Sequence, residues 1–306
     1  MTLVNFILIR VVLVIGYHLL LVPQLLKENI ENATVCTFIP HIWPSSELFR
    51  CLPRTYSSLH NVEAKEILNG IMASNFVGFQ GLSYVRHFMN CALRVTGSES
   101  IGMKIEHNGR KVPLFTHPTG VFAEKATGFL KTLAAKVEGY KKSFGDKKII
   151  VAIDSADQMR GIKHKLRGFK SFLQDHPMQN DKVILVQVIT PDIDVDATAE
   201  SKVMESVNLI NGKYGTIASP IVVLYCHKII EEEYYSLLQV ADVYLNTSER
   251  DSIPSTILDF ILSQADDHHG QLIVSEFVAL ASYLEYAFRV NPWDKKVQTK
   301  LILEHI

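Results

Sequence analysis

The sequence has 306 residues, of which 47% are hydrophobic and 21% charged, as in an ordinary globular protein with one large or two medium domains. Its 31 Lys and Arg residues balance 32 Asp and Glu residues, so the net charge of −1 gives no basic excess for nucleic acid or an anionic membrane. The cysteines lack the spacing of a metal site, which predicts buried thiols in a reducing, cytoplasmic environment; they are Cys36, Cys51, Cys91 and Cys226.

The N-terminal segment allows two interpretations. Residues 3–26 are nearly all apolar, which matches the length of a membrane helix. Arg10 and Pro23 interrupt this run, and residues 11–15 are β-branched and short, as is typical of a buried parallel strand. We therefore expect a buried strand followed by a helix at 18–27, with a signal or anchor segment as the alternative.

Strand-like and helix-like stretches alternate along the rest of the chain. The strands are expected at 34–39, 76–79, 111–115, 148–153, 182–189, 221–225, 243–246 and 271–275. The helices are expected at 64–72, 83–95, 123–143, 162–173, 200–211, 231–241 and 256–263.

This alternation predicts an α/β fold with parallel sheets that are covered by helices on both faces. The polar sequence Gly-Asp-Lys-Lys at 145–148 separates two sets of such elements, so we expect one domain at 1–146 and a second at 147–306. Ligands in open α/β sheets bind beyond the carboxyl ends of the strands. The segments that follow strands in the second domain are therefore the first place to look for a site.

Two of these segments carry polar side chains without a decisive pattern. Residues 154–161 open a helix whose N-terminus can bind an anion around Arg160, although Asp157 is also a good helix cap. Residues 247–256 offer hydroxyl groups that can bind phosphate or cap a helix, and Pro254 suits a helix start. Ordinary capping is the favoured interpretation of both segments.

The sequence contains none of the common phosphate-loop, dinucleotide, zinc-protease or serine-hydrolase motifs. Asp-Asp-His-His at 266–269 has the chemistry of metal ligands, but adjacent loop residues point in different directions, so it indicates a solvated turn. The spacing of residues alone therefore predicts a fold class, no metal and no particular reaction.

Short runs of residues spread over the chain carry a family likeness. Residues 44–53 read Pro-Ser-Ser-Glu-Leu-Phe-Arg-Cys-Leu-Pro, and residues 291–294 read Asn-Pro-Trp-Asp. These runs, in this order, resemble the trehalose-6-phosphate synthase family (glycosyltransferase family 20), whose segments read P-S-S-E-[IL]-F-R-C-L-P and N-P-W-D. Further matches lie at 17–26, 75–80, 84–88, 108–110, 118–120, 210–215, 241–242 and 275–277. The chain looks most like the degenerate synthase-like domains in regulatory and phosphatase subunits of the fungal-type trehalose synthase complex.

The resemblance implies the GT-B fold, which has two Rossmann-like domains with parallel sheets and a cleft between them. The N-terminal domain is expected to be incomplete, because the family's first strand and Gly-Gly loop have no counterpart in the sequence. Active members transfer glucose from UDP-glucose to glucose-6-phosphate with retention and use no metal, so no cofactor is expected. Fixed cations and helix amides stabilise the charge that develops on the diphosphate.

The resemblance also assigns nucleotide-sugar-binding positions, several of which depart from the family pattern. The family's D-R-L-D-Y-x-K-G supplies an Arg and a Lys to the diphosphate, and these positions are Ser155 and Arg160. Arg in place of Lys keeps the charge but not the geometry. The D-G-M-N-L-V loop keeps Asp251, loses its glycine and gains Pro254, which has no amide donor. The family's ribose-binding Glu is Asp259 in this sequence.

On the acceptor side, the resemblance assigns Tyr17, His18 and Arg86. The family's acceptor-binding Asp is Gly16, and the Arg that holds the acceptor phosphate falls at Ile193. The active-site His falls on Pro40, so His41 can act as a catalytic residue with Asp251 only if the local backbone slips by one residue.

A retained framework with lost ligand-binding residues predicts a catalytically impaired protein of trehalose biosynthesis, acting as a regulatory or scaffold subunit beside synthase or phosphatase subunits. A lost charged donor weakens binding by roughly 1.5–3 kcal/mol, and a lost transition-state donor lowers the rate by ~10²–10³. Two alternatives stay open: an active retaining glucosyltransferase that makes trehalose-6-phosphate, or a truncated fragment without function. Weak binding of UDP-glucose or glucose-6-phosphate is compatible with an impaired site, and no nucleic-acid or membrane partner is expected.

Overall fold

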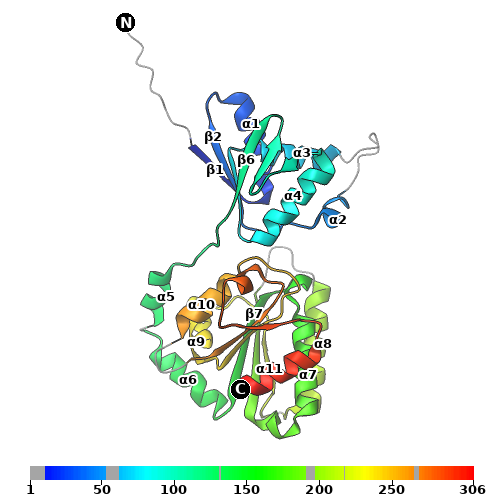
Figure 1. Cartoon of the computed structure of the whole chain (residues 1–306). Helices are drawn as coiled ribbons and strands as arrows, with labels where there is room; N and C mark the ends of the chain where they lie inside the picture. Colours follow the sequence, from blue (N-terminus) through cyan, green and yellow to red (C-terminus); the bar gives the residue numbers. More distant parts are fainter. Residues whose placement is uncertain (1–10, 53–61, 131, 191–196, 217, 265–268) are drawn as a thin grey trace. The chain divides into compact units, whose positions relative to one another are not determined.

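The computed structural model describes residues 11–52, 62–130, 132–190, 197–216, 218–264 and 269–306. Its contacts divide the chain into two compact units, Met1–Thr119 and Gly120–Ile306. Each unit has its own sheet of mainly parallel strands with helices packed against it (Figure 1). The α/β prediction is therefore confirmed.

The first unit is built on a six-stranded sheet. Its strands are β1 (Val11–Ile15), β2 (Thr34–Ile39), β3 (Phe76–Phe79), β4 (Glu99–Ser100), β5 (Lys104–His107) and β6 (Arg110–Thr116). Its helices are α1 (Val22–Asn29), α2 (Ser46–Phe49), α3 (Val62–Met72) and α4 (Leu82–Thr96). The strand order is β1-β2-β3-β6-β5-β4; the first four strands in this order run parallel, whereas β4 and β5 add an antiparallel edge.

Helices α1, α3 and α4 cover one face of this sheet. Val14 and Val35 pack with the apolar side of α1, and Phe79 contacts Phe88 of α4 with ring centroids 5.2 Å apart. Trp43 completes this aromatic core, with its ring centroid 5.1 Å from that of Phe88. Because α3 contacts both α1 and α4, the three helices form one continuous layer.

The N-terminal prediction is confirmed in part. The strand and the helix are present as β1 and α1. The expectation that the strand is buried is wrong, because β1 lies at the edge of the sheet and its side chains at 11, 13 and 15 are exposed. A run of β-branched residues predicts a strand, but which face receives a covering layer depends on distant parts of the chain.

Among the described residues, no helix combines the length and the apolar character needed to span a membrane.

The second unit is built on a six-stranded sheet with every strand parallel. Its strands are β7 (Lys148–Ser155), β8 (Val183–Thr190), β9 (Val222–Tyr225), β10 (Val243–Asn246), β11 (Gln271–Ser275) and β12 (Phe288–Val290). Its helices are α5 (Ala123–Leu130), α6 (Ala134–Phe144), α7 (Ile162–Asp175), α8 (Ala197–Tyr214), α9 (Glu231–Val240), α10 (Ser255–Ser263) and α11 (Lys295–His305). The strand order is β12-β11-β10-β7-β8-β9.

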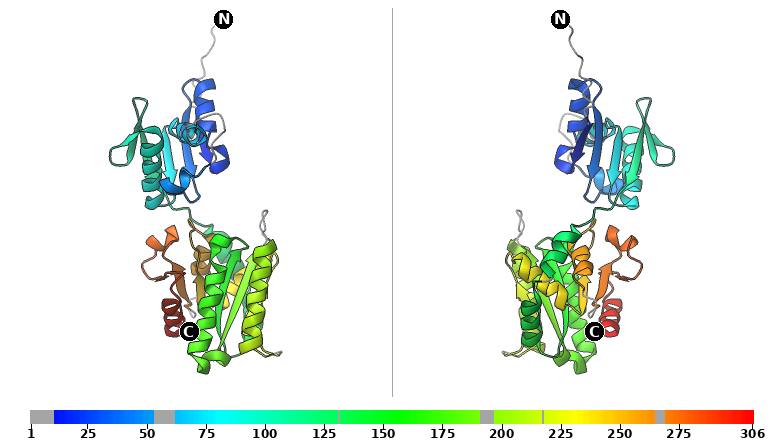
Figure 2. Two further views of the ribbon diagram at one scale, coloured as in Figure 1. Left: turned by 90° about the vertical axis from the view of Figure 1, so that its right-hand side faces the viewer. Right: turned by 90° about the vertical axis from the view of Figure 1, so that its left-hand side faces the viewer.

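Helices cover both faces of this second sheet (Figure 2). On one face, Leu166 of α7 and Val207 of α8 belong to one apolar cluster. On the other face, Leu238 of α9 and Phe260 of α10 belong to a second cluster. This double layer brings the loops that follow β7 and β10 to the same edge of the sheet, because parallel strands end on the same side.

The compact units differ from the predicted domains in the placement of residues 120–146. Helix α5 contacts α9 and α10, and α6 contacts α9, so both pack within the second unit. The Gly-Asp sequence that suggested a boundary is the turn between α6 and β7, where Gly145 has a positive φ of 64°. A helix-to-strand turn and a domain linker use the same polar and glycine residues, so their composition alone cannot distinguish them.

All four cysteines are free thiols, but they differ in burial. Cys91 is buried, Cys36 and Cys226 are half-buried, and Cys51 is exposed. The prediction of buried thiols is therefore wrong for Cys51, which lies on the surface just after the short helix α2.

Candidate functional site

Arg160 lies in the loop that joins β7 to α7, at the carboxyl edge of the second sheet. Its Nε donates to Ser155 Oγ at 3.0 Å, and its Nη1 forms an ion pair with Asp251 Oδ2. Ser155 ends β7, and Asp251 lies in the loop after β10. The structure thus brings together three of the residues that the family resemblance assigned to the nucleotide sugar.

The two loops that meet at this ion pair are also joined through their backbones. Asp157 caps the 3₁₀ helix η2 (Gln158–Arg160) by accepting from the backbone N of Met159 at 3.1 Å, which confirms its predicted capping role. Met159 O accepts from the backbone N of Glu249 at 2.8 Å. Thr247 Oγ1 donates to Gly161 O at 3.1 Å, so the loop carrying Arg160 is fixed at both ends.

Gly161 is required at this junction for two reasons. Its φ of 66° is in the left-handed region that side chains disfavour. A Cβ atom at this position would lie 1.9 Å from Thr247 O, so the backbones approach more closely than any larger residue allows.

A buried ion pair lies beneath the loop that carries Arg160. Lys165 Nζ on α7 donates to Asp154 Oδ2 on β7, and the same oxygen accepts from Gln187 Nε2 at 2.8 Å. Burial lowers the pKa of the Lys165 ammonium, and the Asp154 carboxylate opposes that shift. The predicted site did not include this pair, although a Lys on the apolar side of α7 with Ile162 and Phe169 was a signal for it.

The carboxylate of Asp251 is held on both of its oxygens. Oδ2 faces the Arg160 guanidinium, and Oδ1 accepts from the backbone N of Ser252 at 2.8 Å. Burial raises the pKa of the Asp251 carboxyl, and the charge of Arg160 opposes that rise. A diphosphate placed here would meet a cation that is already neutralised and a carboxylate that repels it.

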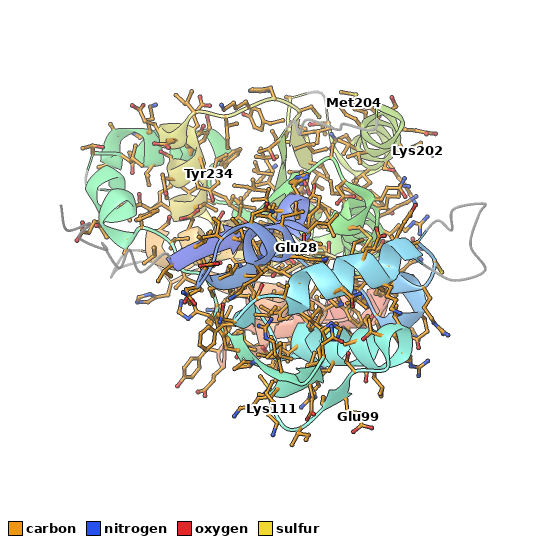
Figure 3. All side chains as sticks on the ribbon, turned by 90° about the horizontal axis from the view of Figure 1, so that it is seen from above. Glu28, Glu99, Lys111, Lys202, Met204 and Tyr234 are labelled. Atoms are coloured by element: carbon orange, nitrogen blue, oxygen red, sulfur yellow. The ribbon has the colours of Figure 1, made fainter. Side chains whose placement is uncertain are left out.

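Asp259 contacts a different set of side chains. It is buried on α10, where its Oδ2 accepts from the Tyr234 hydroxyl at 2.8 Å and its Oδ1 from the Tyr235 hydroxyl at 3.5 Å (Tyr234 is labelled in Figure 3). Burial, followed by the nearby Tyr244 hydroxyl and the Asp259 charge, raises the pKa of Tyr234. The structure therefore places Asp259 in a tyrosine network between α9 and α10.

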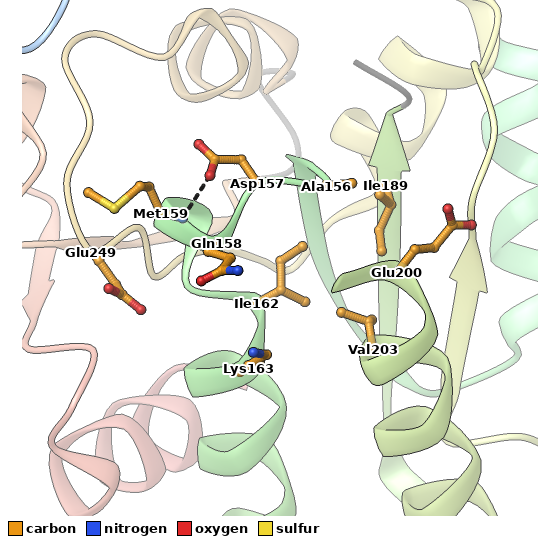
Figure 4. Close-up of a pocket in the computed structure, with 10 residues that line it drawn as sticks. All are labelled: Ala156, Asp157, Gln158, Met159, Ile162, Lys163, Ile189, Glu200, Val203 and Glu249. Carbon is orange, nitrogen blue, oxygen red and sulfur yellow. Dashed lines mark hydrogen bonds between the residues drawn. The ribbon is translucent and has the colours of Figure 1, made fainter. Parts of the chain in front are cut away.

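A small pocket of about 140 Å³ opens beside the Arg160 loop, between η2 and α8 (Figure 4). Its charged lining comes from Asp157, Glu200 and Glu249, against a single Lys163. The remaining lining residues are Ala156, Gln158, Met159, Ile162, Ile189 and Val203. Three carboxylates against one ammonium disfavour a phosphate group. Sequence patterns did not predict this pocket, because its walls come from four separate segments.

In the first unit, three of the predicted residues gather at the carboxyl edge of the sheet. The rings of Tyr17 and His18 have centroids 3.9 Å apart, and those of Tyr17 and His41 are 5.1 Å apart. Burial, assisted by the charge of His18, lowers the pKa of His41. β2 ends at Ile39, so His41 lies beyond the strand and contacts Tyr17 from the loop that follows. The catalytic role assigned to His41 stays a prediction.

The structure describes one of the two other acceptor-side positions, Arg86, but not the other, Ile193. Arg86 lies on the second turn of α4 and is exposed. Ile193 lies outside the described residues, so the position that corresponds to the family's phosphate-binding Arg has no structural description.

Comparison with known proteins decides the family. The model of glycosyltransferase family 20 matches residues 10–305 of this sequence. The chain belongs to glycosyltransferase family 20. Two family 20 relatives come from Saccharomyces cerevisiae: the 56 kDa subunit of the UDP-forming alpha,alpha-trehalose-phosphate synthase and the trehalose-phosphatase. The first is 35% identical over an alignment of 289 positions that covers 91% of this chain and 56% of the relative. The second is also 35% identical, over an alignment of 308 positions that covers 94% of this chain and 33% of the relative.

Solved family 20 structures give the same result for the fold. The N-terminal domain of the Candida albicans trehalose-6-phosphate phosphatase superposes with a TM-score of 0.90 at 35% identity, over 96% of this chain and 62% of that one. A Burkholderia xenovorans trehalose-phosphate synthase superposes with a TM-score of 0.88 at 20% identity, a level that supports the fold alone. The predicted GT-B architecture is confirmed, and the chain spans little more than half the length of the first synthase relative.

Proposed function

We propose that this chain is a trehalose-6-phosphate synthase-like protein of trehalose biosynthesis that is catalytically impaired and acts as a regulatory or scaffold subunit. The observation that carries this proposal is Ser155, a neutral residue that accepts a hydrogen bond from Arg160 and stands where the family has a diphosphate-binding Arg. Arg160 occupies the position from which the family's Lys contacts the donor diphosphate, and it pairs with Asp251, which the family also has.

The surroundings of this ion pair support a weak donor site. Ser155 stands where the family has a second cation, and its hydroxyl accepts from Arg160. Pro254 has no backbone N–H to offer to a nucleotide. Each lost charged donor lowers binding by roughly 1.5–3 kcal/mol. Two such losses reduce affinity by about a hundredfold or more, since each 1.4 kcal/mol is a factor of about ten.

The relatives suggest the kind of partner. They include a synthase described as a subunit and a trehalose-phosphatase, and both match this chain at 35% identity. We expect the chain to associate with synthase or phosphatase subunits of this type, in the cytoplasm. Co-purification of the chain with a tagged synthase or phosphatase tests this association, and its absence would contradict a scaffold role.

Calorimetry with UDP-glucose, combined with an assay of UDP release in the presence of glucose-6-phosphate, tests the impairment directly. We expect weak or undetectable heat of binding and no UDP above the background. Tight, saturable binding with stoichiometric UDP release would instead support the active glucosyltransferase, in which Asp251, Arg160, His41 and Arg86 rebuild the site. A chain without a cooperative thermal transition would support the non-functional fragment.

A further inference from the structure

A short 3₁₀ helix, η1 (Tyr17–Leu19), connects β1 to α1 at the carboxyl edge of the first unit's sheet. None of its residues is buried, and Tyr17 is 56% exposed. So few core contacts make η1 one of the least firmly held elements of this unit.

The backbone on either side of η1 is fixed. The backbone N of Gly16 donates to Phe38 O at 3.1 Å, which ties the end of β1 to β2. Leu20 O lies so close to α3 that a Cβ atom on Gly70 would be 2.7 Å from it. Gly16 itself has a φ of 96° and open space around its Cβ position, so it can act as a hinge. Any local movement is therefore confined to residues 17–19.

The loop after β2 provides a rigid surface opposite η1. Trp43 anchors this loop, because it is 4% exposed and its ring centroid lies 6.0 Å from that of Phe79. His41 precedes Trp43 by two residues and meets Tyr17 edge-on, with ring centroids 5.1 Å apart and an interplanar angle of 76°. The contact between Tyr17 and His41 thus joins a weakly held segment to a firmly held one.

The Tyr17 ring contacts two imidazoles at once. The His18 ring centroid lies 3.9 Å from that of Tyr17, and His18 is the charged neighbour that acts on His41. Although His41 keeps contact with solvent, partial desolvation and the charge of His18 lower its pKa. Carboxylates are absent from β1, η1, β2 and residues 40–45, so these described segments offer no counter-charge to a doubly protonated pair.

We propose that the contact between Tyr17 and His41 is a pH-sensitive latch, which holds η1 against the loop after β2 at neutral pH and releases it on acidification. One imidazolium is tolerated, because a cation can pack against an aromatic ring. The second must form beside the first, and repulsion between the two charges separates the segments that carry them.

The direction of the pH dependence follows from the shift at His41. The latched chain binds a proton at His41 less readily than an unfolded chain does, because the His41 pKa is lowered from the usual histidine pKa of 6.5. The latch is therefore fully stable above this value and loses stability as the pH falls below it. The cluster of Tyr17, His18 and His41 is consequently assembled at neutral pH and dispersed in acid.

Nuclear magnetic resonance of the whole chain, with labelled histidine and tyrosine rings, tests the latch between about pH 8 and pH 5. We expect a nuclear Overhauser effect between the Tyr17 and His41 rings at the upper pH and its loss at the lower one. The midpoint of the His41 titration should lie below that of His117, which is exposed after β6.

Two matched variants separate charge repulsion from other effects of acid. His18→Gln removes the first charge, so the His41 midpoint should rise towards that of His117 and the ring contact should persist to lower pH. His117→Gln removes an imidazole elsewhere on the same unit and should leave both the His41 midpoint and the ring contact unchanged. Circular dichroism at each pH shows whether the variants stay folded.

Four results would overturn the proposal. The first is a ring contact that is absent at pH 8 or retained at pH 5. The second is a His41 midpoint equal to that of His117. The third is release at an unchanged pH in His18→Gln, and the fourth is release that coincides with loss of the circular dichroism signal, which would show unfolding of the unit. None of these results depends on whether the Arg160 site binds a nucleotide sugar.

Discussion

The carboxylate of Asp251 lies against the guanidinium of Arg160, although 91 residues separate them along the chain. The pair joins the loop after β7 to the loop after β10, so a conformational change in one loop affects the other. A polyanion that enters this place has to compete with Asp251 for the guanidinium. Changes at these two positions therefore give the clearest test of the site.

Replacing Asp251 with Asn should strengthen binding of UDP by about tenfold, because a competing charge-assisted contact to Arg160 is removed. Calorimetric titration with UDP measures the change. Asp175→Asn removes the same charge at the other end of α7 and serves as the control. Equal effects of the two substitutions would show that net charge, and not release of Arg160, governs binding.

Replacing Ser155 with Arg should restore a cation at the family's diphosphate position and strengthen binding of UDP-glucose by about tenfold to a hundredfold. Ser155→Gln supplies a long side chain without a charge and should change the affinity little. Calorimetry on both variants separates charge from size. If the Arg variant binds no better than the Gln variant, weak donor binding has a cause other than the missing cation.

Lys165→Met should destabilise the second unit by about 3–5 kcal/mol, because the Asp154 carboxylate then stays buried without its counter-ion. Chemical denaturation followed by circular dichroism measures the free energy of unfolding. Lys300→Met is the matched control, since Lys300 forms an exposed ion pair with Glu304 at 3.6 Å, and such pairs contribute less than about 1 kcal/mol. A small loss for Lys165→Met would show that Asp154 takes up a proton or water instead.

Gly161→Ala should destabilise the fold by at least about 2 kcal/mol, because the added methyl group meets Thr247 O and the backbone conformation is left-handed. Gly139→Ala provides the opposite case, since Gly139 lies within α6 with open space around its Cβ position. That substitution should stabilise by roughly 0.5–1 kcal/mol through helix propensity. Thermal melting of both variants shows whether each substitution stabilises or destabilises the fold. Stabilisation by Gly161→Ala would contradict the close approach of the two loops.

Burial, assisted by the negative charge of Glu200, raises the pKa of the Cys226 thiol to about 11. Because the thiolate is the reactive form, about 1% of Cys226 is reactive at pH 9, and its alkylation rate should climb about tenfold per pH unit up to pH 11. Glu200→Gln should lower this pKa and speed the reaction at pH 9. Mass spectrometry of the alkylated peptide measures both rates, and a Cys226 rate that levels off near pH 9 would contradict the raised pKa.

The sequence predicted the parallel strands of both sheets well, because buried β-branched runs such as 183–189 carry a strong local signal. It did not predict β4 and β5, which are short and polar, or the final β12 and α11. The exposure of β1 was missed for a different reason. The pattern of β-branched residues predicts a strand, whereas the burial of its side chains depends on which elements pack against the sheet.

Within the candidate site, family likeness identified Ser155, Arg160 and Asp251 but not their mutual contacts. The ion pair depends on loops that follow two different strands, a relationship that no local pattern contains. The likeness also assigned Asp259 to the ribose, while the structure surrounds it with tyrosines of α9. A motif match gives the position of a residue in the fold, and the partners of its side chain follow from the packing of neighbouring helices.

Two hydrogen bonds couple the loops after β7 and β10: Thr247 Oγ1 donates to Gly161 O, and the backbone N of Glu249 donates to Met159 O. A ligand that displaces one loop therefore either breaks these hydrogen bonds or moves the other loop with it, and we expect the second outcome. In hydrogen–deuterium exchange, the amides of 157–161 and 247–251 should gain or lose protection together, as a single cooperative segment of the second unit.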